Sequence, residues 1–103
     1  MIRVMFYAGE RGFTRVNVSG HAGYAPGGED IVCSAVSSAV MLIANAITEI
    51  LGQEADVQVF ENEVDIRLPG QPGASALIFM QALHLHLTLL QQQHSKHITI
   101  TEV

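Results

Sequence analysis

The apolar segment IVCSAVSSAVMLIANAITEIL, residues 31–51, decides the fold. Apolar residues surround nearly its whole helical circumference, its only charge is Glu49, and Gly52 follows it as a stop signal. Asp30, directly before it, belongs to the residue types preferred at an N-cap. We therefore expect one helix over this segment, beginning at Ile31, that is central and mostly buried.

The same segment is long enough to cross a bilayer, which raises the question of a membrane helix. It contains Ser, Asn and Thr side chains, and no Lys or Arg stands at either end to anchor it at lipid headgroups. The amphipathic strands around it also need an apolar layer on which to pack. We therefore expect a core helix and no association with membranes.

Short alternating segments flank this helix in the sequence. Apolar and polar residues alternate over residues 2–7, 14–19, 57–59, 64–68 and 98–100. Turn residues join the first four segments in pairs, which predicts two hairpins. A second periodic apolar stretch, residues 74–93, predicts another helix. Each strand has one apolar face, so both helices should cover the same face of the sheet. The sequence predicts an α+β two-layer sandwich: a five-stranded mixed sheet with two helices, in the order ββαββαβ, as a single domain over residues 1–103.

The composition argues against several classes of protein. Ten acidic and five basic side chains give a net charge of −5, and the basic residues are scattered. Phosphate backbones are bound by clustered Lys and Arg, so we expect no direct nucleic-acid partner. The single cysteine excludes an intrachain disulfide, and residues 1–7 lack the apolar run of a signal peptide. We therefore expect a cytoplasmic protein.

Cys33 is the strongest candidate for a catalytic residue. If Asp30 is the N-cap, Cys33 is the third helical residue, where the positive end of the helix dipole favours the reactive thiolate. The backbone amides of Cys33 and Ser34 could hold the oxyanion that forms when a peptide carbonyl is attacked. His21, twelve residues earlier, could accept the thiol proton. Spacing alone leaves open that Cys33 is a small buried apolar residue and His21 an ordinary loop residue.

The segment between these two residues is rich in glycine and proline, which predicts a loop. We expect it to close over an extended peptide, and its candidate substrate-binding residues are Gly23, Tyr24, Gly27, Gly28 and Glu29. Asp30, at its end, has three open roles: capping the helix, orienting His21, or binding substrate. A phosphate-binding loop is disfavoured because the Gly-Lys-Ser/Thr ending of a Walker motif is missing.

Four histidines in the last fifth of the chain raise the question of a metal site: His84, His86, His94 and His97. His84 and His86 are two residues apart on the predicted helix and therefore point in different directions. The sequence contains no His-Glu-x-x-His pattern. We expect neither a metal nor another cofactor.

The stretch GHAGYA (residues 20–25), followed by GEDIVCSAVS (residues 28–37), resembles the ribosomal-processing cysteine protease family, Prp. The spacing from His to Cys and the order of helices and strands are also similar to the family's. Two departures are Ser34, where the family more often has Ala, and the approach to the last strand, residues 93–98. Neither departure changes the Cys–His pair.

The resemblance implies a function that composition does not. Cys33 would be the nucleophile of a cysteine endopeptidase, His21 its base, and residues 23–29 the loop that orders when peptide binds. The implied substrate is the precursor of the twenty-seventh protein of the large ribosomal subunit, whose N-terminal extension is removed by a cut after an aromatic residue. The implied assembly is a homodimer.

Two other classes of function stay open from the sequence. A non-catalytic ribosome-assembly factor could bind a basic ribosomal protein through the loop and a sheet edge. A small-molecule thioester or acyl hydrolase could use the same Cys–His pair, but it would need a deep apolar pocket.

Overall fold

The computed structural model describes residues 1–20 and 29–103, with Glu29 and Asp30 described by their backbone alone. Its elements, in chain order, are β1 (Ile2–Ala8), β2 (Phe13–Ser19), α1 (Glu29–Asn45), a π-helical turn η1 (Ala46–Ile50), β3 (Asp56–Phe60), β4 (Glu63–Arg67), α2 (Ala74–Gln93) and β5 (Ile98–Glu102). The predicted α+β class and the order ββαββαβ are confirmed.

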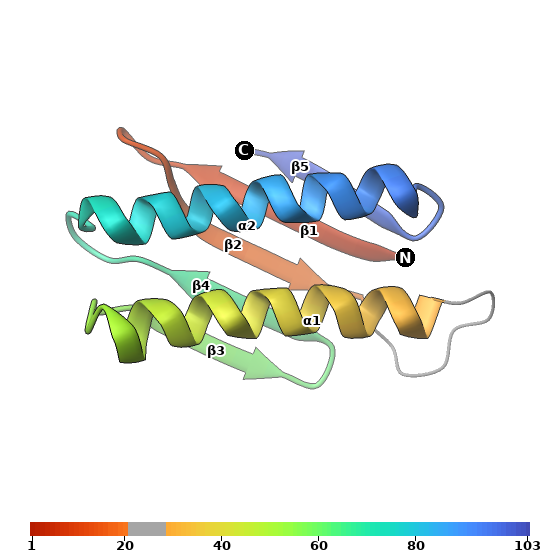
Figure 1. The fold of residues 1–103 in the computed structure, drawn as a ribbon, viewed down its shortest axis with the longest axis horizontal. Coiled ribbons are helices and arrows are strands. Elements are labelled where there is room, and N and C mark those ends of the chain that lie inside the picture. Colours follow the sequence, from red (N-terminus) through yellow and green to blue (C-terminus); the bar gives the residue numbers. More distant parts are fainter. Residues whose placement is uncertain (21–28) are drawn as a thin grey trace.

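The five strands form one sheet in the order β3-β4-β2-β1-β5. β1 pairs antiparallel with β2, β2 with β4, and β3 with β4, whereas β1 and β5 run parallel, so the sheet is mixed as predicted. Both helices lie on the same face of this sheet (Figure 1). The architecture is therefore the predicted two-layer sandwich, with β3 and β5 as the sheet edges.

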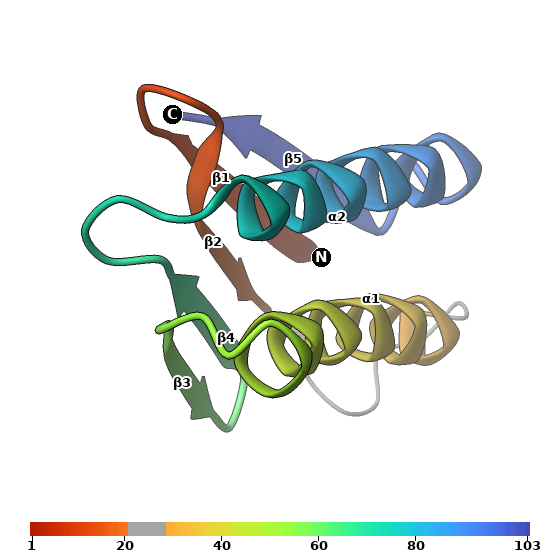
Figure 2. The same cartoon turned by 60° about the vertical axis from the view of Figure 1, so that its left-hand side comes forward.

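The two helices run antiparallel and divide the sheet between them. α1 lies on the side of β3 and β4, and α2 on the side of β1 and β5 (Figures 1 and 2). The core lies between these layers. Its sheet residues are Ile2, Val4, Phe6, Val16, Val18, Val64, Ile66, Leu68 and Ile98, and its helix residues are Val32, Val36, Val40, Ala44, Ile47, Ala76, Met80, Leu83 and Leu87.

The prediction that the first helix is mostly buried is wrong. α1 buries a single stripe of residues spaced three or four apart, which is the width that one sheet can cover. Ile31 is 74% exposed and Leu42 is 67% exposed. Because the fold has two layers, the outer face of each helix has no covering layer within the described part of the chain.

The exposed apolar faces of α1 and α2 raise the question of whether either helix crosses a membrane. By length and composition, Ile31–Ile50 and Ala74–Gln93 could each cross a membrane. Each nevertheless packs one apolar stripe against the sheet, in the manner of a core helix. The two helices are therefore amphipathic in their packing even though their sequences are apolar on most sides.

The first helix begins earlier than predicted and changes its hydrogen-bonding pattern in its last turn. It begins at Glu29, so Asp30 is its second residue rather than its N-cap. At the other end, the α-helix passes into η1 at Ala46, where the Leu51 amide donates to the Ala46 carbonyl at 3.0 Å. Gly52, with φ +63°, then ends the helix where the sequence predicted.

Candidate active site

Cys33 lies on a defined flank of α1. Val32 and Val36 point into the core, and Ala35 and Ala39 line a groove shared with α2. With about 3.6 residues per turn, Cys33 falls on the opposite flank, away from α2. Its side chain is partly exposed and packs against the edge of the core. The thiol is therefore placed over the β3–β4 half of the molecule, within reach of the surface.

The start of α1 at Glu29 argues against the predicted role of the Cys33 and Ser34 amides in binding an oxyanion. In an α-helix that begins at Glu29, Cys33 is the fifth residue, and its amide donates to the carbonyl of residue 29. The amides without a helical acceptor are the earlier ones. For the amides of Cys33 and Ser34 to hold an oxyanion, the first turn would have to open. The dipole effect on Cys33 is also smaller than predicted, because it falls off beyond the first turn.

The chain enters the candidate site through a constrained glycine. β2 ends at Ser19, and Gly20 follows with φ +88°, a conformation that favours glycine. A Cβ at this position would collide with the carbonyl oxygen of Met1. The Gly20 amide donates to the carbonyl of Asn62 in the β3–β4 turn at 3.0 Å. The direction in which the chain leaves β2, toward His21, is therefore fixed by two neighbouring segments.

The structure describes only part of the predicted site. His21, Gly23, Tyr24, Gly27 and Gly28 lie outside the described residues, and the side chains of Glu29 and Asp30 do as well. The end of β2 and the beginning of α1, which flank this segment, lie at the same end of the molecule (Figure 1). The pairing of His21 with Cys33 and the roles of the loop residues stay predictions.

A polar cluster on the open face of the sheet was not anticipated from the sequence. Arg15 donates from Nε and Nη2 to Asp65 Oδ2, at 3.1 and 2.9 Å, and its guanidinium stacks on the Tyr7 ring, 4.6 Å from the ring centroid. Asn17 Nδ2 bridges Asp65 Oδ2 and Glu63 Oε2, at 2.8 and 2.7 Å. The cluster joins β1, β2 and β4.

The charge of Asp65 is stabilised by these partners. Burial, with 8% of the residue exposed, raises its pKa, but hydrogen bonds from Arg15 and Asn17 outweigh this effect. The net pKa of Asp65 is lowered from its ordinary value. The alternation of the strands placed these polar residues on one face, but only the strand register brings them into contact.

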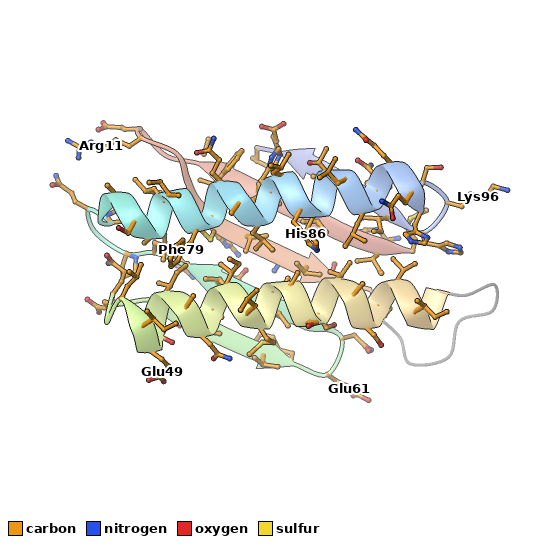
Figure 3. All side chains as sticks on the ribbon, in the orientation of Figure 1. Arg11, Glu49, Glu61, Phe79, His86 and Lys96 are labelled. Carbon is orange, nitrogen blue, oxygen red and sulfur yellow. The ribbon has the colours of Figure 1, made fainter. Side chains whose placement is uncertain are left out.

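The histidines do not form a metal centre within residues 1–20 and 29–103, where no three His, Cys, Asp or Glu side chains gather. The His84 ring stacks on Phe13 with centroids 4.7 Å apart and meets Phe6 edge-on at 4.9 Å. His86 instead lies in the groove between the helices (Figure 3). The neighbouring histidines thus point in different directions, as expected from their spacing.

Two pockets lie away from Cys33. One, of about 300 Å³, lies between the β1–β2 turn and the linker before α2 and is lined by Arg11, Leu68 and Leu77 among others. The other is the interhelical groove, of about 520 Å³. Cys33 lines neither, so neither supplies the deep apolar pocket that an acyl hydrolase would need around the nucleophile.

Comparison with solved structures shows the same fold in proteins from S. aureus and Streptococcus mutans. The chain matches the essential ribosomal processing protease Prp from S. aureus, in complex with a substrate peptide, with a TM-score of 0.93, 22% identity and full coverage of both chains. The same protease with a covalently linked product peptide matches with a TM-score of 0.88, 23% identity and full coverage of both chains. SMU.848 from Streptococcus mutans matches with a TM-score of 0.90 and 24% identity, over 100% of this chain and 97% of that one.

A search of curated protein sequences found no significant match. The family model described as cysteine protease Prp, however, matches residues 1–99, nearly the whole chain. This match includes the segment with the single cysteine. The chain therefore belongs to the Prp family of cysteine proteases.

Proposed function

We propose that this chain is an endopeptidase that removes the N-terminal extension from a ribosomal protein precursor, with Cys33 as nucleophile and His21 as general base. One observation carries the assignment of the nucleophile. The chain belongs to a cysteine protease family and its sequence contains a single cysteine. The substrate class is supported by the fold that the chain shares with the ribosomal processing protease Prp from S. aureus.

In the proposed reaction, His21 takes the proton of the Cys33 thiol as the sulfur attacks the carbonyl carbon of the scissile bond. The C–N bond then breaks, the amine leaves with the proton from His21, and an acyl-enzyme remains on Cys33. Water, deprotonated by His21, hydrolyses the thioester and restores the thiol. The partly exposed flank on which Cys33 lies gives an extended peptide access to the sulfur.

The residues around the pair have supporting roles in this proposal. Gly23, Tyr24, Gly27, Gly28 and Glu29 cover the bound peptide. Asp30, as the second residue of α1, adds negative charge where the helix dipole favours it, and it is close in sequence to the loop that carries His21. Asp30 therefore either stabilises the helix start or orients the imidazole.

The decisive experiment is cleavage of a purified ribosomal protein precursor, followed by intact mass. We expect the wild-type chain to remove the extension and Cys33→Ala and His21→Ala to leave it in place. Ser38→Ala, an exposed change on the same helix, serves as the matched control and should cleave normally. Cleavage by Cys33→Ala would overturn the nucleophile. Binding without cleavage by every variant, the wild type included, would favour the assembly-factor alternative.

We further propose that the chain is a cytoplasmic homodimer. The support for dimerisation is the outer helical surface, defined here as Leu42 on α1 with Ile78, Leu85 and Leu89 on α2, all exposed. The interhelical groove lies beside it, and His86 and Phe79 project from α2 toward α1 (Figure 3). An exposed apolar surface of this kind is typical of a protein interface. The single cysteine supports a reducing compartment.

A further inference from the structure

Strand β3 is an unusually bare edge of the sheet. It pairs with β4 alone among the described strands, and its outer edge has no strand partner there. Four of its five residues are exposed, including two large apolar ones, Val59 at 61% and Phe60 at 56%. Exposed apolar edge strands are templates for pairing with another extended chain, and proteins ordinarily protect them.

The register shows which backbone groups this edge presents. Phe60 faces Glu63 across the two-residue turn 61–62. These two residues therefore form the hydrogen-bonded pair that closes the hairpin. Hydrogen-bonded and non-hydrogen-bonded pairs alternate along an antiparallel ladder. The N–H and C=O groups of Val57 and Val59 therefore point outward, away from β4. Two successive outward pairs can receive an extended peptide as a sixth strand.

This edge lies on the same side of the molecule as Cys33. The sulfur is on the flank of α1 that faces away from α2, and α1 covers the β3–β4 half of the sheet (Figures 1 and 2). The other edge, β5, lies beside α2. A peptide added to β3 would lie on the same side of α1 as Cys33, whereas a peptide added to β5 would lie on the side of α2.

The charge around β3 indicates which kind of peptide fits. Residues 52–66 contain five acidic residues and no Lys or Arg. Of these, Glu54 is exposed before the strand and Asp56 is exposed at its first position, opposite Arg67 of β4, while Asp65 is held by Arg15. Glu61 at the turn and Glu49 at the end of the helical segment lie on this side of the molecule as well (Figure 3). Natural edges are often protected by Lys, which this one lacks. The surface is therefore complementary to a basic, extended segment that carries apolar side chains.

We infer that the outer edge of β3 binds a basic, extended segment of the substrate by strand addition, on the side of α1 that carries Cys33. The inference rests on the proposed function, because it specifies how that substrate is held. Backbone hydrogen bonds to Val57 and Val59 supply affinity independent of sequence, and Val59 and Phe60 contact apolar side chains on opposite faces of the peptide strand. Glu54 and Asp56 select for positive charge.

The sharpest test removes one outward N–H without touching the ladder to β4. Val59→Pro deletes that donor, whereas Val59→Thr keeps it together with the β-branched shape. With a peptide substrate that carries a basic flank, we expect kcat/KM to be on the order of 10-fold lower for Val59→Pro than for Val59→Thr, chiefly through KM. Equal values for the two variants would overturn the inference.

A matched control uses the other edge. The Val103 amide donates to the Phe6 carbonyl, so the Glu102 amide points away from β1 and outward from β5. Glu102→Pro therefore deletes an outward N–H on the β5 edge instead of the β3 edge, and it should leave cleavage unchanged. Circular dichroism confirms that the compared variants are folded. An equal loss of kcat/KM in Glu102→Pro and Val59→Pro would contradict a role specific to β3.

Charge reversal tests whether Glu54 and Asp56 favour the binding of a basic peptide. The double variant Glu54→Lys/Asp56→Lys should raise KM on the order of 10-fold for the basic peptide and should weaken the salt dependence of cleavage. The double variant Glu10→Lys/Glu102→Lys makes the same change of net charge in the β1–β2 turn and on β5, away from the β3 edge, and is the control. The same KM increase in this control would show a general charge effect and would overturn the acidic selection.

A binding measurement separates this inference from the proposed function. In isotope-labelled Cys33→Ala protein, the basic peptide should shift the amide signals of Val57 and Val59 on binding. If the wild type does not cleave but these signals shift, the strand site stands and the proposed protease function fails. If the wild type cleaves and these signals do not shift, the function stands and the strand site fails. A shift that depends on protein concentration without peptide would instead show pairing of two β3 edges, which also overturns the inference.

Discussion

The amide of Gly20 donates a hydrogen bond to the carbonyl of Asn62 at 3.0 Å, which ties the end of β2 to the β3–β4 turn. Gly20 is held at φ +88°, with the Met1 carbonyl against the side where a Cβ would be. The chain that leads to His21 and the hairpin that carries the bare edge strand are thus held in one arrangement. The two proposed parts of the site, the base and the substrate-binding edge, depend on the same glycine.

Gly20→Ala should therefore reduce both stability and cleavage. The left-handed conformation and the collision with the Met1 carbonyl together should lower the free energy of unfolding by about 1–3 kcal/mol. Gly70→Ala is the matched control, because Gly70 also has positive φ, +67°, but open space around it and a place in the linker before α2. It should lose about 1 kcal/mol and keep its activity. Denaturant unfolding and peptide cleavage on both variants check this, and normal cleavage by Gly20→Ala would contradict it.

Asp65→Asn should change the acid stability of the protein. The pKa of Asp65 is lowered in the folded chain, so in acid the unfolded chain binds this proton first. The stabilisation is therefore complete above the unfolded pKa, near pH 4, and is lost as the pH falls through the folded pKa.

At neutral pH, Asp65→Asn should lower the free energy of unfolding by about 1–2 kcal/mol. This difference from the wild type should shrink below about pH 4, where the wild type also loses its carboxylate. Urea unfolding at a series of pH values measures it. A difference that stays constant across this range would show that the charge of Asp65 is not what stabilises the cluster.

Leu42→Glu should convert the proposed dimer into a monomer. Leu42 is 67% exposed in the single chain, so a charge there costs the folded monomer little, whereas in an apolar interface it would be buried and unpaired. Light scattering after size exclusion reads the mass directly. Val103→Glu, an exposed apolar residue at the C-terminus, is the control and should stay dimeric. A monomeric wild type would end the dimer proposal.

Met80→Ala should report the contribution of α2 to the core. Met80 is fully buried against the sheet, and its truncation should cost about 2–5 kcal/mol by leaving a cavity. Gln81, the next residue on the same helix, is exposed, and Gln81→Ala should change stability by less than about 0.5 kcal/mol. Thermal or urea unfolding of the pair checks this, and similar losses in both variants would contradict the packing.

The fold could be predicted because its signals are local. Alternation of period two in the strands and the long apolar run before Gly52 specify each element from its own residues. The position of Cys33 at the start of a helix follows from the same run. The helix start was misplaced by two residues, since a capping residue type at Asp30 does not determine where the first turn begins.

The sequence by itself determined the order of elements, the sheet with one apolar face, and the single cysteine that we propose as nucleophile. The tertiary structure alone decided which strand became the bare edge, that Arg15 meets Asp65 fifty positions away, and that the apolar helices keep an outer face uncovered. The physical reason is the range of the interactions. Periodicity is fixed by neighbours in the chain, whereas register, edges and uncovered faces depend on how distant segments pack.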